Sequence, residues 1–220
     1  MKHFAWKTLS LRLVLVLVAS AGPLAFPLSQ MGYASLHRLA LVLVLPSAAV
    51  LWIAWLVLEK RGSHELAGTL AQGAAAGAAA TLALEAVRYT GFRLGFMPGN
   101  LPELMGVLLM DRFALGPSTA SSLAGFAYHF WNGASFGVIF ALLAGGFSRA
   151  LAIPYGLGIG LGFLVSPVVQ ALGVGLLGKD FGWRFAATVL SAHAAYGVAL
   201  GWFLAHRRGF CLAAGCVCAR

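Results

Sequence analysis

Residues 128–137 read YHFWNGASFG, and the same skeleton returns at residues 193–201 as HAAYGVALG. Both copies follow the pattern H-x-x-x-G-x-x-x-G, and both lie inside apolar runs. On a helix, positions i, i+4 and i+8 share one stripe, so each copy places an imidazole at the head of a flat glycine surface that another helix can approach closely. A histidine inside a membrane span is costly and indicates a functional group with a partner.

The composition predicts an all-α integral membrane protein. Hydrophobic residues make up 60% of the 220 residues and charged residues only 10%, and the mean hydropathy is +0.88. A soluble globular chain carries about 25% charged residues, so that class is excluded. The net charge is +9, but the 15 Lys and Arg are scattered singly between apolar runs. We therefore interpret them as topology signals and expect the bilayer and other membrane helices as partners, in a homo- or hetero-oligomer, with no nucleic acid.

Apolar segments of suitable length predict about six transmembrane helices. The first follows Arg12 and continues to about Gln30 through Pro23 and Pro27; the others cover about 39–58, 66–89, 118–143, 151–177 and 185–205. The sequence Ala19-Ser20-Ala21 also fits a signal-peptide cleavage site, although we favour an uncleaved first span. We expect two N-terminal helices in residues 1–62, a four-helix bundle in 63–208 and a cytoplasmic tail in 209–220.

The longest connection, residues 91–118, is predicted to contain a short helix lying on the membrane surface. Asn100 and Glu103 have the spacing of a capping box, and Pro102 suits a first helical turn. The residues that follow offer an apolar face that ends at Asp111. Such a helix could serve as a lid or a docking surface.

The predicted third and fourth spans, and then the fifth and sixth, each pair a glycine-rich helix with an H-x-x-x-G-x-x-x-G helix. This order predicts duplication of a two-helix unit, with both copies in the same orientation and the two histidines entering from the same side. The small residues expected to pack helices closely are Gly73, Gly77, Gly133, Gly137, Gly197 and Gly201.

The basic residues predict the orientation. Counting them by side gives nine on the side of the N-terminus and six on the other, which favours both ends in the cytoplasm of a bacterial cell with the chain in its inner membrane. The tail then holds Cys211, Cys216 and Cys218, whose spacing would allow a soft metal or a lipid to bind. Because the tail follows the last apolar run, we favour an unstructured segment.

The strongest site prediction brings Glu85, His129 and His193 to one level of the membrane. Helix rise places the two histidines roughly 12–16 Å below the outer surface and Glu85 roughly 6–14 Å below it. Two histidines and one carboxylate form a ligand set for iron, zinc or copper. The neighbouring groups expected to hydrogen-bond these ligands are Arg88, Asn132, Ser166 and Gln170.

Other functions stay open beside a single metal ion. Glu85 could pair with Arg88 three residues on, with each imidazole joining helices, so that the chain is a packing subunit of a larger complex. His129 and His193 could hold haem b, or the polar groups could form a proton path or a small transporter. No P-loop, nucleophile elbow, dinucleotide fingerprint or H-E-x-x-H occurs in the sequence, so we do not expect an ordinary enzyme.

The two H-x-x-x-G-x-x-x-G helices, preceded by the helix from Gly73 to Glu85, resemble small uncharacterised polytopic inner-membrane proteins of bacteria. The resemblance covers roughly residues 66–205 and leaves the first two spans outside it. It implies a membrane bundle and carries no activity with it.

Overall fold

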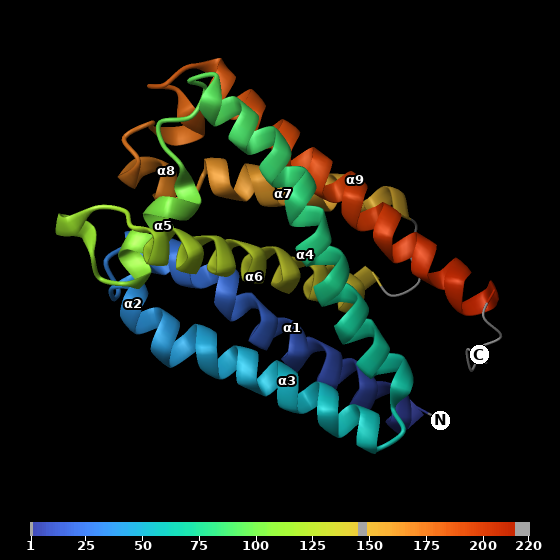
Figure 1. Ribbon diagram of the computed structural model, residues 1–220. Coiled ribbons are helices and arrows are strands. Elements are labelled where there is room, and N and C mark those ends of the chain that lie inside the picture. The colour runs from blue at the N-terminus through green and yellow to red at the C-terminus, as the bar shows by residue number, and fades with distance from the viewer. Residues whose placement is uncertain (1, 145–148, 214–220) are drawn as a thin grey trace.

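A computed structural model describes residues 2–144 and 149–213, with the side chains of 9–144 and 150–205, and the described part is all-helical (Figure 1). The α-helices are α1 (Lys2–Gln30), α2 (Leu36–Leu39), α3 (Leu45–Lys60), α4 (His64–Arg93), α5 (Leu101–Leu109), α6 (Thr119–Ala144), α7 (Ala152–Leu164), α8 (Pro167–Ala171) and α9 (Trp183–Ala213). A π-helical turn, η1 (Ala40–Val44), joins α2 to α3, and the 3-10 turns are η2 (Phe113–Leu115), η3 (Arg149–Leu151) and η4 (Leu176–Gly178).

The predicted all-α class is confirmed for the described residues, and five of their helical stretches are long and apolar enough to cross a membrane. They are Leu9–Gln30, Leu36–Lys60, His64–Arg93, Thr119–Ala144 and Trp183–Ala205. Their outward surfaces carry large apolar side chains, with Leu17 72% exposed, Val42 70% and Leu123 68%. Water would penalise such surfaces, whereas lipid would not.

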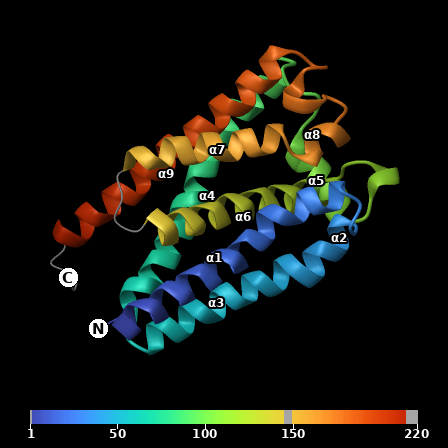
Figure 2. The same ribbon diagram turned by 180° about the vertical axis from the view of Figure 1, so that it is seen from behind.

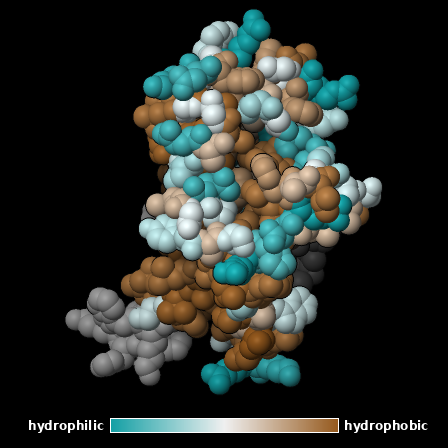
Figure 3. Space-filling model, turned by 90° about the vertical axis from the view of Figure 1, so that its left-hand side faces the viewer, coloured by the Kyte–Doolittle hydropathy of each residue, from teal (hydrophilic) through white to brown (hydrophobic). Residues whose placement is uncertain are grey.

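The helices run back and forth along one bundle, and α4 crosses α6 at a steep angle before it runs alongside α9 (Figure 1). Seen from behind, α3, α1, α6, α7 and α9 follow one another across the molecule, with α4 on the far side (Figure 2). The first half of α4 packs on α6 and its second half on α9. The N-terminal end of α1 and the C-terminal end of α9 lie at the same end of the bundle. Hydrophilic and hydrophobic residues are intermixed over the opposite end, which carries α2, α5 and α8 (Figure 3).

Glycines let α4 and α6 touch backbone to backbone. A Cβ on Gly73 would lie 2.8 Å from the carbonyl oxygen of Gly137, and a Cβ on Gly77 would collide with that of Gly133. Only the absence of side chains permits this approach, which in lipid supplies the dispersion contacts that hold two apolar helices together. The first H-x-x-x-G-x-x-x-G helix therefore uses its glycine stripe against α4.

The second glycine stripe packs against α7 instead. A Cβ on Gly197 would lie 2.9 Å from the Cα of Ile153 and would collide with the carbonyl oxygen of Ala152, while a Cβ on Gly156 would collide with the carbonyl oxygen of His193. Gly201 is also buried. The two pairs thus make similar contacts, but no internal repeat is shown, and the duplication stays a prediction.

The predicted fifth span is corrected by the structure. Instead of one helix over 151–177, α7 ends at Leu164 and a separate short helix, α8, begins at Pro167. Ser166 is extended (φ −76°, ψ 161°), because the proline ring that follows it excludes the helical conformation. The 13 residues of α7 rise roughly 20 Å, less than the roughly 30 Å hydrocarbon core, so five long apolar helices replace the expected six in the described residues.

The predicted short helix in the 91–118 connection exists as α5, but it is packed into the bundle. Gly106 lies against the backbone of Ser121 on α6, and Pro102, Met105 and Val107 are buried. Asn100 occupies the N-cap position without a side-chain capping bond, so the predicted capping box is wrong. Its side chain has a different partner, described below.

Several predictions stay untested. The assignment of the three segments 1–62, 63–208 and 209–220 is one, and the compartment and orientation of the chain are others. Cys216 and Cys218 lie outside the described residues, and the side chain of Cys211 is not described either.

Candidate functional site

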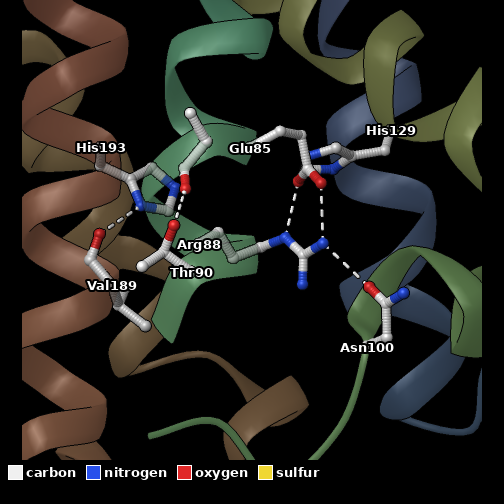
Figure 4. A network of polar contacts seen from close by, with 8 residues as sticks. Glu85, Arg88, Thr90, Asn100, His129, Val189 and His193 are labelled. Atoms are coloured by element: carbon white, nitrogen blue, oxygen red, sulfur yellow. Dashed lines mark hydrogen bonds and ion pairs between the residues drawn. The ribbon is translucent and has the colours of Figure 1, made fainter. Parts of the chain in front are cut away.

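A buried ion pair joins Glu85 and Arg88, which lie three residues apart on α4. Nε of Arg88 donates to Oε1 of Glu85 at 2.6 Å, and Nη2 donates to Oε2 at 2.7 Å (Figure 4). The two side chains are only 13% and 5% exposed. Two parallel charge-assisted hydrogen bonds are the geometry in which guanidinium and carboxylate interact best. This pairing, expected as the alternative to a metal site, satisfies both carboxylate oxygens.

His129 from α6 meets the same carboxylate. Its Nε2 lies 2.9 Å from Oε1 of Glu85, an ion-pair distance when the imidazole is protonated. The ring nitrogen is buried and is not aligned for a hydrogen bond with any described residue. The prediction that Glu85 and His129 share one level of the bundle is therefore correct as a contact, and α4 and α6 each contribute a polar group to it.

His193 is not part of this contact. Its Nδ1 lies 2.8 Å from the carbonyl oxygen of Val189, one turn earlier on α9, and its ring stands where a Cβ on Gly160 would be, about 3.0 Å away (Figure 4). The described residues contain no group of three or more His, Cys, Asp or Glu side chains that could hold a metal ion. The predicted ligand set is thus not assembled. Depth along a helix does not fix the direction in which a side chain points around it.

The four residues predicted to hydrogen-bond the metal ligands do not all lie at the site. Arg88 and Asn132 lie at the site, and Asn132 carries a buried Oδ1 with no partner among the described residues. Ser166 borders the same space, but its hydroxyl donates to Phe163 and caps α8. Gln170 is exposed and does not line this space, and its predicted role stays a prediction. It lies beyond the helix break at Pro167, which turns it away from the bundle interior.

Asn100 is the functional residue that the sequence did not reveal. Its Oδ1 accepts from Nη2 of Arg88 at 2.8 Å, across twelve residues and a loop. The asparagine before the helix-starting Leu101-Pro102 had suggested a cap, and a buried guanidinium competes successfully for the same oxygen. The loop between α4 and α5 is thereby tied to the buried ion pair.

A cavity of about 400 Å³ lies beside this cluster, inside the bundle. Most of its wall is apolar, and its residues come from α1, α4, α5, α6, α7, α8 and α9; they include Leu84, Met105, Phe136, Ile139, Ile159, Phe163 and Val168. The polar side chains in its wall include those of Arg88, Asn132, His129 and His193. Haem ligation by His129 and His193 stays a prediction that this geometry does not test.

Two residues show where the cavity reaches the outside of the bundle. Leu24 on α1 is 53% exposed and Gly162 on α7 is exposed, yet both line the cavity. Both helices face lipid if the bundle spans a membrane. The wall of the cavity at α1 and α7 therefore includes residues on the outside of the bundle.

No protein-family model matches this sequence, and comparisons with curated proteins and with solved structures found no match either. The resemblance to small inner-membrane proteins of bacteria stays an expectation. Arguments about function therefore rest on the site itself.

Proposed function

We propose that this chain is a multi-pass membrane protein whose central cavity binds a small lipophilic molecule. The observation that carries the proposal is the apolar cavity of about 400 Å³ within the bundle. Its volume falls in the range of small-molecule sites, roughly 300–1,000 Å³, and such sites are mostly apolar with a few polar groups that orient the ligand. Arg88, His129 and Asn132 supply those groups here.

Imperfect packing is a poor account of a cavity this large. Protein interiors are close-packed and contain few voids larger than a water molecule. In the same bundle, α4 packs against α6 and α7 against α9 with their backbones in contact. The chain thus packs its helices tightly where it needs to, and the cavity lies between those two pairs, bordered by residues of all four helices.

The exposed wall residues Leu24 and Gly162 support a ligand that arrives from the bilayer. A lipophilic molecule partitions into the hydrocarbon core and can reach Leu24 and Gly162 without crossing water. The apolar wall of the cavity then covers the apolar part of the ligand without any loss of hydrogen bonds. The polar end of the ligand can accept a hydrogen bond from Arg88 on α4.

Transport is the second candidate, and the break between α7 and α8 favours it. Discontinuous helices form the binding sites of many transporters, and here the break lies toward the end of the bundle that carries α8. Phe163, Ser166 and Val168 lie on both sides of this break and line the cavity. A transporter would move the same ligand that a binding protein holds, so one binding experiment tests the basis of both.

Two glycines on α7 provide a matched test. A Cβ added to either Gly158 or Gly162 meets no atom within 4 Å, yet only Gly162 lines the cavity. We expect Gly162→Leu to remove lipophilic compounds that co-purify with the protein, as detected by mass spectrometry, and Gly158→Leu to retain them. Equal retention by both variants, or no bound compound in the unmodified protein, would contradict the proposal.

A further inference from the structure

Arg88 has donors left over after its contacts within the chain are counted. Nε and Nη2 bind Glu85, and Nη2 also binds Asn100. Nη1 points away from both partners in Figure 4 and is buried without a hydrogen-bond partner among the described residues. The residue as a whole is 4% exposed. A buried donor left unpaired is costly and demands an explanation at the site.

The unpaired donor belongs to a residue that lines the cavity. Asn132 lines it too, and its buried Oδ1 has no hydrogen-bond partner among the described residues, whereas the buried Nε2 of His129 lies 2.9 Å from Oε1 of Glu85. A few polar groups that border an otherwise apolar space are typical of a site that orients a polar end of a ligand. The rest of the cavity wall is apolar and therefore fits a ligand with a long apolar body.

The net charge of Glu85 and Arg88 restricts the class of ligand further. The bidentate contact pairs one carboxylate with one guanidinium, so Glu85 and Arg88 together are neutral. An anionic head group would add a second buried negative charge beside Glu85, and the guanidinium of Arg88 is already paired with that carboxylate. An uncharged carbonyl oxygen accepts a hydrogen bond and adds no charge.

We infer that the cavity selects an uncharged, carbonyl-bearing lipophile, such as a long-chain ketone or ester, whose oxygen accepts from Nη1 of Arg88. The inference rests on the proposed function, because it specifies the ligand of that cavity. It assigns Arg88 a ligand-binding role in addition to its ion pair, with Glu85 as the residue that keeps the site electrically neutral.

Three probes of equal carbon number test the polar end separately from the apolar body: methyl nonyl ketone, undecanoate at alkaline pH, and undecane. The readout is the rise in unfolding temperature of the full chain in detergent as each probe is titrated. Subtracting the response of Gly162→Leu removes effects of the probes on the micelle. We expect the ketone to bind about tenfold more tightly than undecane, as one hydrogen bond to a charged donor allows, and undecanoate to bind most weakly.

A charge swap then tests the role of Glu85. Glu85→Gln keeps the shape of the side chain but leaves Arg88 uncompensated, so undecanoate should become the tightest of the three probes. Glu85→Asp keeps the charge and serves as the control, in which the ketone should stay ahead of undecanoate. If Glu85→Gln does not fold, the order of the three probes in the unmodified protein decides alone.

The outcomes separate this inference from the proposed function. Equal binding of ketone and undecane, both lost in Gly162→Leu, would overturn the carbonyl inference and leave the cavity proposal standing. Tightest binding of undecanoate by the unmodified protein would overturn it in the same way. No cavity-dependent binding of any probe would overturn both.

Discussion

The hydroxyl of Tyr196 on α9 donates a hydrogen bond to the carbonyl oxygen of Gly133 on α6 at 2.7 Å, and this bond joins the two H-x-x-x-G-x-x-x-G helices directly. The tyrosine is the third residue after His193 in one copy, and the glycine is the first glycine of the other. Tyr196 is 2% exposed, so the bond lies in the bundle interior. It spans the region between the two tightly packed helix pairs and borders the cavity.

Removing this hydroxyl should loosen the bundle. We expect Tyr196→Phe to lower the free energy of unfolding by about 1 kcal/mol, the net value of one intramolecular hydrogen bond, because the ring still fills its place. Thermal unfolding in detergent measures the change. Tyr33→Phe is the control, since Tyr33 is 72% exposed, and equal stability of the two variants would show that the interhelical bond contributes nothing.

The contact between α4 and α6 should not tolerate a single methyl group. In Gly77→Ala the new Cβ collides with the carbonyl oxygen of Gly133, so the helices must separate at a cost of about 1–3 kcal/mol. Gly68 lies on the same helix, and a Cβ there has its nearest neighbour, Nε2 of Gln72, at 3.8 Å. Gly68→Ala should therefore stabilise the protein by about 0.5–1 kcal/mol. Unfolding curves of the two variants should therefore give changes in unfolding free energy of opposite sign. Destabilisation of similar size at both positions would argue against a packing-specific effect.

The ion pair predicts strong coupling between Glu85 and Arg88. Arg88→Met strands a buried carboxylate and should destabilise the protein by about 3–5 kcal/mol. Replacing both residues, as Glu85→Leu with Arg88→Met, removes the stranded charge and should restore much of that loss. A double-mutant cycle on unfolding free energies gives the coupling, and additive effects would mean that the two side chains do not interact in the membrane.

The orientation predicts which reagents reach the C-terminal cysteines. With both ends cytoplasmic, Cys211, Cys216 and Cys218 should react in intact cells only with maleimides that cross the inner membrane. Labelling by a membrane-impermeant maleimide would place the C-terminus outside. A cysteine introduced at Gly99, in the loop at the other end of the bundle, should show the opposite accessibility and serves as the internal control.

Much of the fold follows from local sequence, because the length of an apolar run and the position of a proline act on their own segment. The predicted first, second, third, fourth and sixth spans all appear as long helices. The predicted fifth span failed at Ser166-Pro167, where the residue before proline leaves the helical conformation, although α1 continues through Pro23 and Pro27. The helix in the long connection was predicted, but its burial against Ser121 and Gly125 was not, since small residues signal close packing without naming the partner.

The sequence by itself determined that the chain forms long apolar helices and that Glu85, His129 and His193 lie within them. Only the tertiary structure decided how they associate. Helix rise sets depth, but the rotation and crossing angle of each helix, which arise from contacts with neighbours, set direction. Those contacts turned His129 toward Glu85 and left His193 bonded to Val189. They also brought Asn100 to Arg88, because a buried guanidinium needs acceptors and the folded chain supplies one from a distant loop. The same contacts left an apolar cavity beside these residues.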